Sequence, residues 1–112
     1  MAKPANRSYS RYAREAAELL GTMINSARAE RALTVTEVAE RAGVSRGLVQ
    51  RIENGDMGCS IGAVFEVAAV LGLRLFDADP TTLTKHLAMA RDKLVLLPKK
   101  ARPGTKKVKD EF

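Results

Sequence analysis

The sequence has few of the residues that build metal centres, disulfides or aromatic cores. Among 112 residues there is one cysteine, Cys59, one histidine, His86, and no tryptophan. A single cysteine excludes an intrachain disulfide and is typical of an intracellular protein. One cysteine and one histidine cannot build a zinc site, so we expect no metal or cofactor. Aromatic residues make up only 4% of the chain, and a core of small aliphatic residues favours helix packing, hence an all-α fold.

Long apolar runs and catalytic patterns are also missing. No apolar run approaches the roughly 20 residues that cross a bilayer, and the N-terminal residues lack the apolar stretch of a signal peptide. There is no phosphate-binding glycine loop, and Ser-His-Asp chemistry would have to use His86, which lies far from any nucleophile pattern. We therefore expect a cytoplasmic, nucleoid-associated protein that is not an enzyme.

Positive charge is plentiful but lies at the two ends. The formal net charge is +6, yet residues 15–97 contain nine basic and eleven acidic side chains. Residues 1–14 contain four basic side chains and no acid, and residues 98–112 contain six basic and two acidic ones. Basic arms on a near-neutral core favour a polyanionic partner, although solubilising, disordered ends would have the same composition.

Apolar spacing and capping residues predict five helices. Apolar residues recur at intervals of three and four. Side chains suited to N-caps stand at four expected helix starts, and Gly or Pro stands at most of the expected helix ends. The predicted N-caps are Thr34, Ser45, Ser60 and Asp79. The short segment Leu73–Phe76 has no room for a helix, and we expect a strand or an extended crossing there. The expected helices cover residues 10–31, 34–43, 45–54, 60–72 and 80–97.

The stretch from residue 34 to 54 has the features of two helices joined by a tight turn. Thr34 and Glu37 fit a capping box, Gly43 tolerates a positive φ angle, and Ser45 is a good N-cap. The outer face of the following helix presents side chains suited to reading bases, because arginine pairs with guanine and glutamine with adenine in the major groove. The alternative is an ordinary helical hairpin with a solvated polar face. The base-contacting candidates are Arg46, Gly47, Gln50 and Arg51.

Residues 33–55, LTVTEVAERAGVSRGLVQRIENG, resemble the Xre family of phage Cro and repressor helix-turn-helix domains, with similarity from about residue 20 to 76. The resemblance implies an all-α, five-helix lambda-repressor-like fold, a homodimer and a palindromic operator in double-stranded DNA. It implies a sequence-specific transcriptional regulator that represses its own gene. Carried over by position, Arg46, Gly47, Gln50 and Arg51 touch bases, and Thr34, Ser45 and Asn54 touch phosphates.

Two positions depart from the family pattern. Val35 stands where a glutamine often contacts phosphate, and Gly47 stands where a larger polar residue is usual. Both favour an alternative function, a protein-interaction module that neutralises a partner without specific DNA binding. Arg46 and Arg51 favour DNA binding instead.

The flanking segments resemble HipB-type antitoxins, which repress their own operon and hold a HipA-like kinase toxin. We expect a basic, disordered arm over residues 1–9, the helix-turn-helix domain over 10–79, an extra C-terminal dimerisation helix over 80–97 and a disordered lysine-rich tail over 98–112. Apolar residues of the C-terminal helix repeat at heptad spacing. The alternative is that this face packs on its own domain. The predicted dimer residues are Leu83, Leu87, Ala90, Leu94 and Leu97.

Two further features concern the thiol and the tail. Cys59 precedes a helix start, where the helix dipole would lower the pKa of its thiol and suit a redox switch. The favoured alternative is a small inert residue.

In the tail, Asp110–Phe112 form an acidic-aromatic end. This end would dock on a protein partner while the lysines follow phosphates. The alternative is that these residues form part of a solubilising tail.

Overall fold

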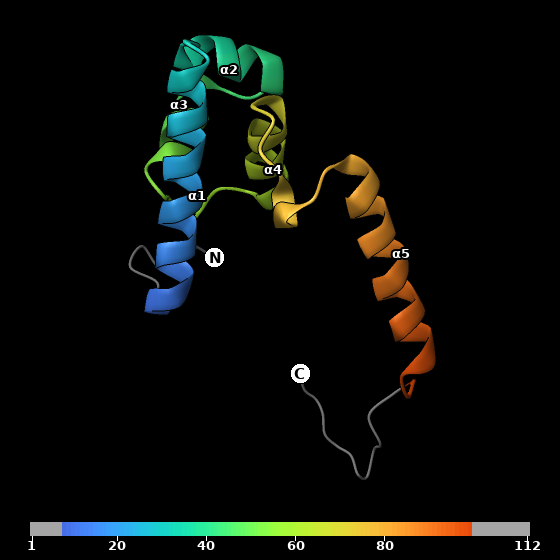
Figure 1. Ribbon diagram of the computed structural model, residues 1–112. Coiled ribbons are helices and arrows are strands. Elements are labelled where there is room, and N and C mark those ends of the chain that lie inside the picture. The colour runs from blue at the N-terminus through green and yellow to red at the C-terminus, as the bar shows by residue number, and fades with distance from the viewer. Residues whose placement is uncertain (1–7, 100–112) are drawn as a thin grey trace. The chain divides into compact units, whose positions relative to one another are not determined.

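The fold is that of a computed structural model, and the structure describes residues 8–99 of the chain. The α-helices are α1 (Arg11–Glu30), α2 (Val35–Ala42), α3 (Arg46–Glu53), α4 (Ile61–Val70) and α5 (Pro80–Leu96), with a short 3-10 turn at Leu75–Asp77 (Figure 1). No strand occurs in these residues, so the predicted all-α fold is confirmed. The chain divides into two compact units, the first ending at Leu75 and the second beginning at Phe76. The predictions for the basic arm and the lysine-rich tail fall mainly on residues outside this range.

Each helix begins at a side chain that satisfies an otherwise unpaired amide. The oxygen of each N-cap residue accepts a hydrogen bond from the backbone N–H three residues further on, over 2.8 to 3.3 Å. Each such cap contributes about 1 kcal/mol to stability. Four of these five caps were predicted from the sequence, and the fifth, Ser10, was not. The N-cap residues are Ser10, Thr34, Ser45, Ser60 and Asp79.

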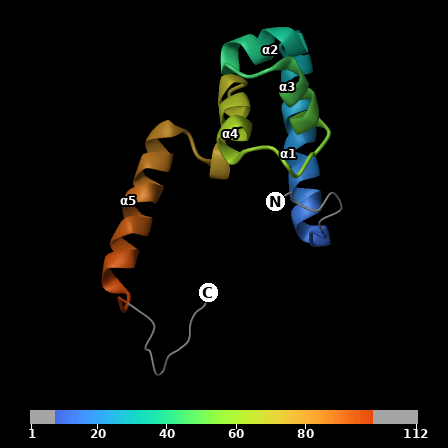
Figure 2. The ribbon, with the colours of Figure 1, turned by 180° about the vertical axis from the view of Figure 1, so that it is seen from behind.

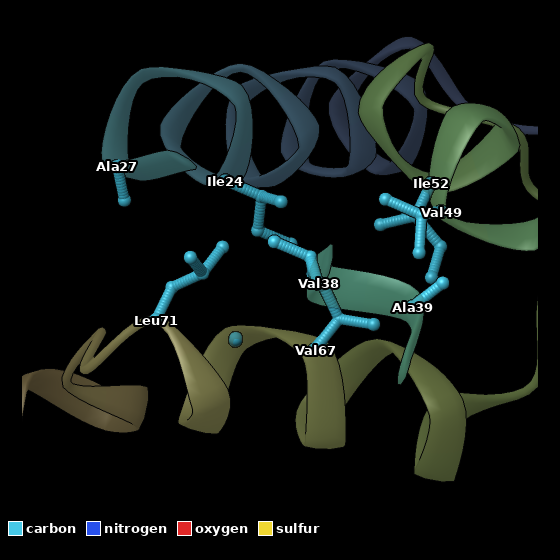
Figure 3. Packing of buried hydrophobic residues seen from close by; sticks show 9 residues of the cluster. Ile24, Ala27, Val38, Ala39, Val49, Ile52, Val67 and Leu71 are labelled. Carbon is cyan, nitrogen blue, oxygen red and sulfur yellow. The ribbon is translucent and has the colours of Figure 1, made fainter. Parts of the chain in front are cut away.

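The first unit packs four helices around a small aliphatic core. In Figures 1 and 2, α2 lies across one end of both α1 and α4, and α3 packs against α1 and α2. Figure 3 shows Ile24 of α1, Val38 of α2 and Leu71 at the C-cap of α4 pointing toward one another. No aromatic residue belongs to this cluster, as the composition predicted. The buried residues of this cluster are Ile24, Ala27, Val38, Ala39, Val49, Ile52, Val67, Ala68 and Leu71.

Gly21 allows α1 and α3 to approach closely. A Cβ built at this position would overlap the carbonyl oxygen of Ile52 and lie 2.9 Å from that of Glu53. Any larger residue would therefore push α3 away from α1. A glycine inside a helix ordinarily only weakens that helix, whereas in this fold Gly21 sets the position of α3.

The segment after α4 differs from the expected strand or extended crossing. Gly72 adopts a left-handed φ of 75°, and the chain then forms the 3-10 turn Leu75–Asp77, in which Phe76 has a φ of 56°. Leu73 and Leu75 are partly buried against the core. The prediction was wrong because these leucines keep the chain on the core surface, where it must turn rather than extend.

Helix α5 begins at Pro80 and ends at Leu96, close to the predicted limits. None of its residues is buried, although leucines recur along its length. Their exposed fractions are 37% for Leu83, 49% for Leu87 and 70% for Leu94. Across the residues that the structure describes, no helix combines the length and apolar character needed to span a bilayer.

Candidate nucleic-acid interface

A three-residue turn joins α2 to α3 and sets their relative direction. Gly43 has a φ of 72°, which lies in the left-handed region that glycine adopts without strain. Its N–H bonds to the Glu40 carbonyl at 3.4 Å, and the Val44 N–H bonds to the Ala39 carbonyl at 3.0 Å. These two bonds form a Schellman motif, with Val44 partly buried against the core. The turn predicted at Gly43 is therefore confirmed.

The capping hydroxyls at the starts of α2 and α3 make different hydrogen bonds. Thr34 accepts from the Glu37 N–H at 3.0 Å, and its own N–H donates to the Glu37 carboxylate at 2.8 Å. This backbone hydrogen bond lowers the pKa of Glu37, and the predicted capping box is confirmed. The Thr34 hydroxyl also donates to Glu37 at 3.3 Å. Ser45 accepts from the Leu48 N–H at 3.1 Å, which leaves its hydroxyl hydrogen for an outside acceptor. Asn54 is exposed at the C-cap of α3.

Helix α3 has a buried side and an exposed side. Val49 and Ile52 are buried in the core, whereas Arg46, Gly47, Gln50 and Arg51 are all exposed. The four predicted base-contacting residues therefore lie on one short helix and outside the core. At Gly47 a Cβ would have no neighbour within 4 Å and φ is not positive, so the local fold does not require glycine at this position.

Arg51 differs from Arg46 because its guanidinium is already engaged. Its Nε donates to the Asp56 carboxylate at 2.9 Å. This hydrogen bond, with the attraction of the Asp56 charge, raises the pKa of Arg51. Asp56 lies in the loop between α3 and α4, and it was not among the residues that the sequence analysis singled out.

A second ion pair, between Arg28 and Glu53, braces α3 against α1. Arg28 donates through Nε and Nη2 to the two oxygens of Glu53 at 2.7 and 3.0 Å, and through Nη1 to the Leu33 carbonyl at 3.0 Å. The Arg28 side chain is 19% exposed and that of Glu53 is 7% exposed. The hydrogen bond to Glu53 is the main cause that raises the pKa of Arg28. The two residues are 25 positions apart, so no local pattern pointed to this pair.

An apolar pocket of about 360 Å³ lies beside the C-terminal end of α3. Its walls come from α1, the loop after α3, and α4, and they include Leu20, Met57 and Phe65. Cys59 also lines the pocket, and burial raises the pKa of its thiol. This direction is opposite to the lowered pKa expected for a reactive thiol, because desolvation by burial outweighs the attraction of the Arg51 charge. Among the described residues no three His, Cys, Asp or Glu side chains gather where they could hold a metal ion.

Comparison with known proteins agrees with this geometry. No curated protein matches the chain. Residues 11–79 match the family described as "Helix-turn-helix domain", a stretch that runs from the first residue of α1 to the N-cap of α5. Because this match includes more than half of the sequence, the chain belongs to the helix-turn-helix domain family.

Proposed function

We propose that the protein is a sequence-specific DNA-binding transcriptional regulator that inserts α3 into the major groove. The observation that carries this proposal is the exposed side of α3, where Arg46, Gln50 and Arg51 follow directly on the α2–α3 turn. Arginine and glutamine are the side chains that pair best with guanine and adenine edges. In helix-turn-helix proteins it is the N-terminal part of the second helix that meets these edges.

Different residues would read bases and hold the backbone. Arg46 and Arg51 would pair with guanine and Gln50 with adenine, while Gly47 would let the helix backbone approach the base pairs. Phosphate contacts would come from Thr34, Ser45 and Asn54. Of these, Ser45 is best supported, since it caps the start of α3 and can still donate its hydroxyl hydrogen. Thr34 is less well suited, because its hydroxyl already donates to the Glu37 carboxylate.

A homodimer on a palindromic operator is the assembly we propose. The exposed heptad leucines of α5 would form the contact between subunits, with Leu83, Leu87, Ala90, Leu94 and Leu97 along the seam. Two α3 helices would then enter successive major grooves about 34 Å apart. We further propose that the regulator is cytoplasmic and nucleoid-associated, represses its own gene, and belongs to the Xre group.

A second candidate function is that of a protein-interaction module that neutralises a partner without specific DNA binding. A HipB-like antitoxin, by contrast, would combine the DNA binding proposed above with the capture of a HipA-like kinase toxin. Val35 favours the interaction module, because it is partly buried against the core and offers no polar group to a phosphate. Gly47 also favours it, since it leaves one position of the reading helix without a side chain. The predicted docking of Asp110–Phe112 on a protein partner belongs to this candidate and concerns residues outside the described range.

Salt dependence of DNA binding distinguishes the two candidates. The full chain is titrated onto the DNA upstream of its own gene and onto an unrelated duplex at 50 and 200 mM salt. If about six or more phosphates are contacted, affinity falls on the order of a thousandfold between these concentrations. The upstream DNA should bind more tightly than the unrelated duplex at both. Equal binding of the two duplexes, or none, would favour the interaction module.

A further inference from the structure

The side chain of Arg51 is hydrogen-bonded to the loop that follows α3. Asp56 accepts the Arg51 Nε–H through Oδ2 at 2.9 Å. Its other oxygen, Oδ1, accepts the backbone N–H of Gly58 at 2.7 Å. A Cβ built at Gly58 would lie 3.5 Å from Nη2 of Arg51, so the guanidinium also lies against the loop backbone. The loop thus orients the carboxylate, and the carboxylate in turn orients the arginine.

This arrangement uses only part of the hydrogen-bonding capacity of the guanidinium. An arginine has five N–H donors, and the bond to Asp56 takes the single donor on Nε. The four donors on the two Nη atoms are enough for the pair of bonds that a guanine accepts at O6 and N7. A side chain that is already oriented loses less conformational freedom when it binds a base. The resulting gain in affinity applies only to a base that matches this orientation.

We propose that Asp56 is a positioning residue for base recognition, which holds Arg51 for a guanine at one position of each DNA half-site. The inference rests on the proposed function, because it requires specific binding through α3. It adds a specificity-determining residue that lies outside the reading helix and that never needs to touch DNA itself.

Because Asp56 is negatively charged, its removal should affect binding to random DNA and the preference for guanine differently. A carboxylate near the interface repels phosphates, so its removal should leave binding to random DNA unchanged or stronger. If Asp56 positions Arg51, the same change should weaken the preference for guanine. The two effects have opposite signs, whereas a loss of folding would weaken both kinds of binding together.

Asp56→Asn is the most informative variant. Its amide oxygen can still accept the Gly58 N–H, while its NH₂ group replaces the oxygen that accepts from Arg51. The full-length wild type, Arg51→Ala, Asp56→Asn and a double variant of both are each used to select preferred sites from a pool of randomised duplexes. Glu66→Gln, an exposed carboxylate on α4, serves as the control for loss of one negative charge. Melting temperatures of all variants are measured alongside.

We expect the wild type to prefer guanine at one position of its selected sites and Arg51→Ala to lose this preference. Asp56→Asn should reduce the preference at that same position by roughly tenfold, within the range that one bidentate pair contributes, with random-duplex affinity equal or higher. The double variant should select the same sites as Arg51→Ala, because the effect of Asp56 on base preference would pass through Arg51. Glu66→Gln should keep the wild-type preference.

Three results would overturn the proposal. Asp56→Asn could keep or sharpen the guanine preference, or it could change the base preference at a position that Arg51→Ala leaves intact. The third such result is a double variant that loses more base preference than Arg51→Ala alone. A wild type that enriches no sequence at all would instead contradict the proposed function. That outcome is distinct from specific binding that ignores Asp56.

Discussion

The helices α1–α4 and the helix α5 use apolar residues in opposite ways. The first four helices bury nine aliphatic residues in one cluster, whereas α5 buries none and leaves Leu94, Val95 and Leu96 at least 70% exposed. In proteins most of the stability of a helix comes from packing of its apolar face. The difference teaches that the first unit is completed by its own core, while α5 keeps its apolar side chains exposed, as the assembly proposed above requires.

The largest expected effect concerns the ion pair in the first unit. Glu53→Ala should lower the free energy of unfolding by about 3–5 kcal/mol, because it leaves the Arg28 guanidinium largely buried without its partner. Urea denaturation followed by circular dichroism measures the loss. Glu66→Gln, a change at an exposed carboxylate, is the matched control and should be nearly silent. A loss below about 1 kcal/mol for Glu53→Ala, the value typical of exposed pairs, would show that this pair does not brace α3.

The contrast between buried and exposed aliphatic residues can be tested directly. Ile24→Ala should cost about 2–5 kcal/mol, because Ile24 is fully buried among four helices. Leu94→Ala removes an aliphatic side chain that is 70% exposed and should change the stability of the monomer by about 0.5 kcal/mol or less. Thermal melts at low protein concentration compare the two. Similar losses would mean that Leu94 contributes to folding of the single chain, and the contrast would disappear.

The role of α5 in assembly is tested by placing charge on its leucine seam. Leu87→Asp combined with Leu94→Asp should convert the proposed dimer to a monomer at micromolar concentration, since each carboxylate would be buried without a partner at a cost of several kcal/mol. Light scattering after size exclusion measures the mass. The melting temperature of the first unit should not change, and operator affinity should fall. A double variant that remains dimeric would place the contact on another element.

Base recognition by the first unit is tested at Arg46. Arg46→Ala should cost about 1–3 kcal/mol on the selected site and much less on random DNA, because it removes a bidentate donor from the exposed side of α3. Fluorescence anisotropy with both duplexes gives the two affinities. Arg41→Ala, an exposed arginine in the last turn of α2, is the control for loss of one positive charge. Equal losses on both duplexes would make Arg46 a backbone contact instead.

The smallest effect concerns the start of α2. The hydrogen bond from Thr34 lowers the pKa of Glu37 from its ordinary value of 4.5. A carboxylate with a lowered pKa stabilises the fold above that ordinary value, and this contribution disappears as the pH falls through the lower folded value. Glu37→Gln should therefore be less stable than the wild type near pH 6 and match it near pH 3, with Glu40→Gln as the control on the same helix. A difference that persists at pH 3 would assign the effect to the altered hydrogen bond alone.

The sequence by itself determined the five α-helices and most of their ends. The caps at Thr34, Ser45 and Ser60 and the turn at Gly43 depend on bonds between residues a few positions apart, so spacing and residue type suffice to predict them. The exposed side of α3 was equally predictable, since helical periodicity assigns Val49 and Ile52 to the core and the arginines to the outside. The roles of those arginines toward DNA remain predictions.

Tertiary structure alone decided how α3 is held. The pairing of Arg28 with Glu53 and the fit of Gly21 against the carbonyl of Ile52 join segments more than 20 residues apart, and no spacing rule links such positions. The 3-10 turn at Leu75–Asp77 likewise follows from leucines that must stay on a core whose position the local sequence does not encode. Asp56 is only five residues from Arg51, but its bond requires the loop to turn back beside α3. Local bonds need only the chain's own neighbours, whereas these contacts exist only after the helices have packed.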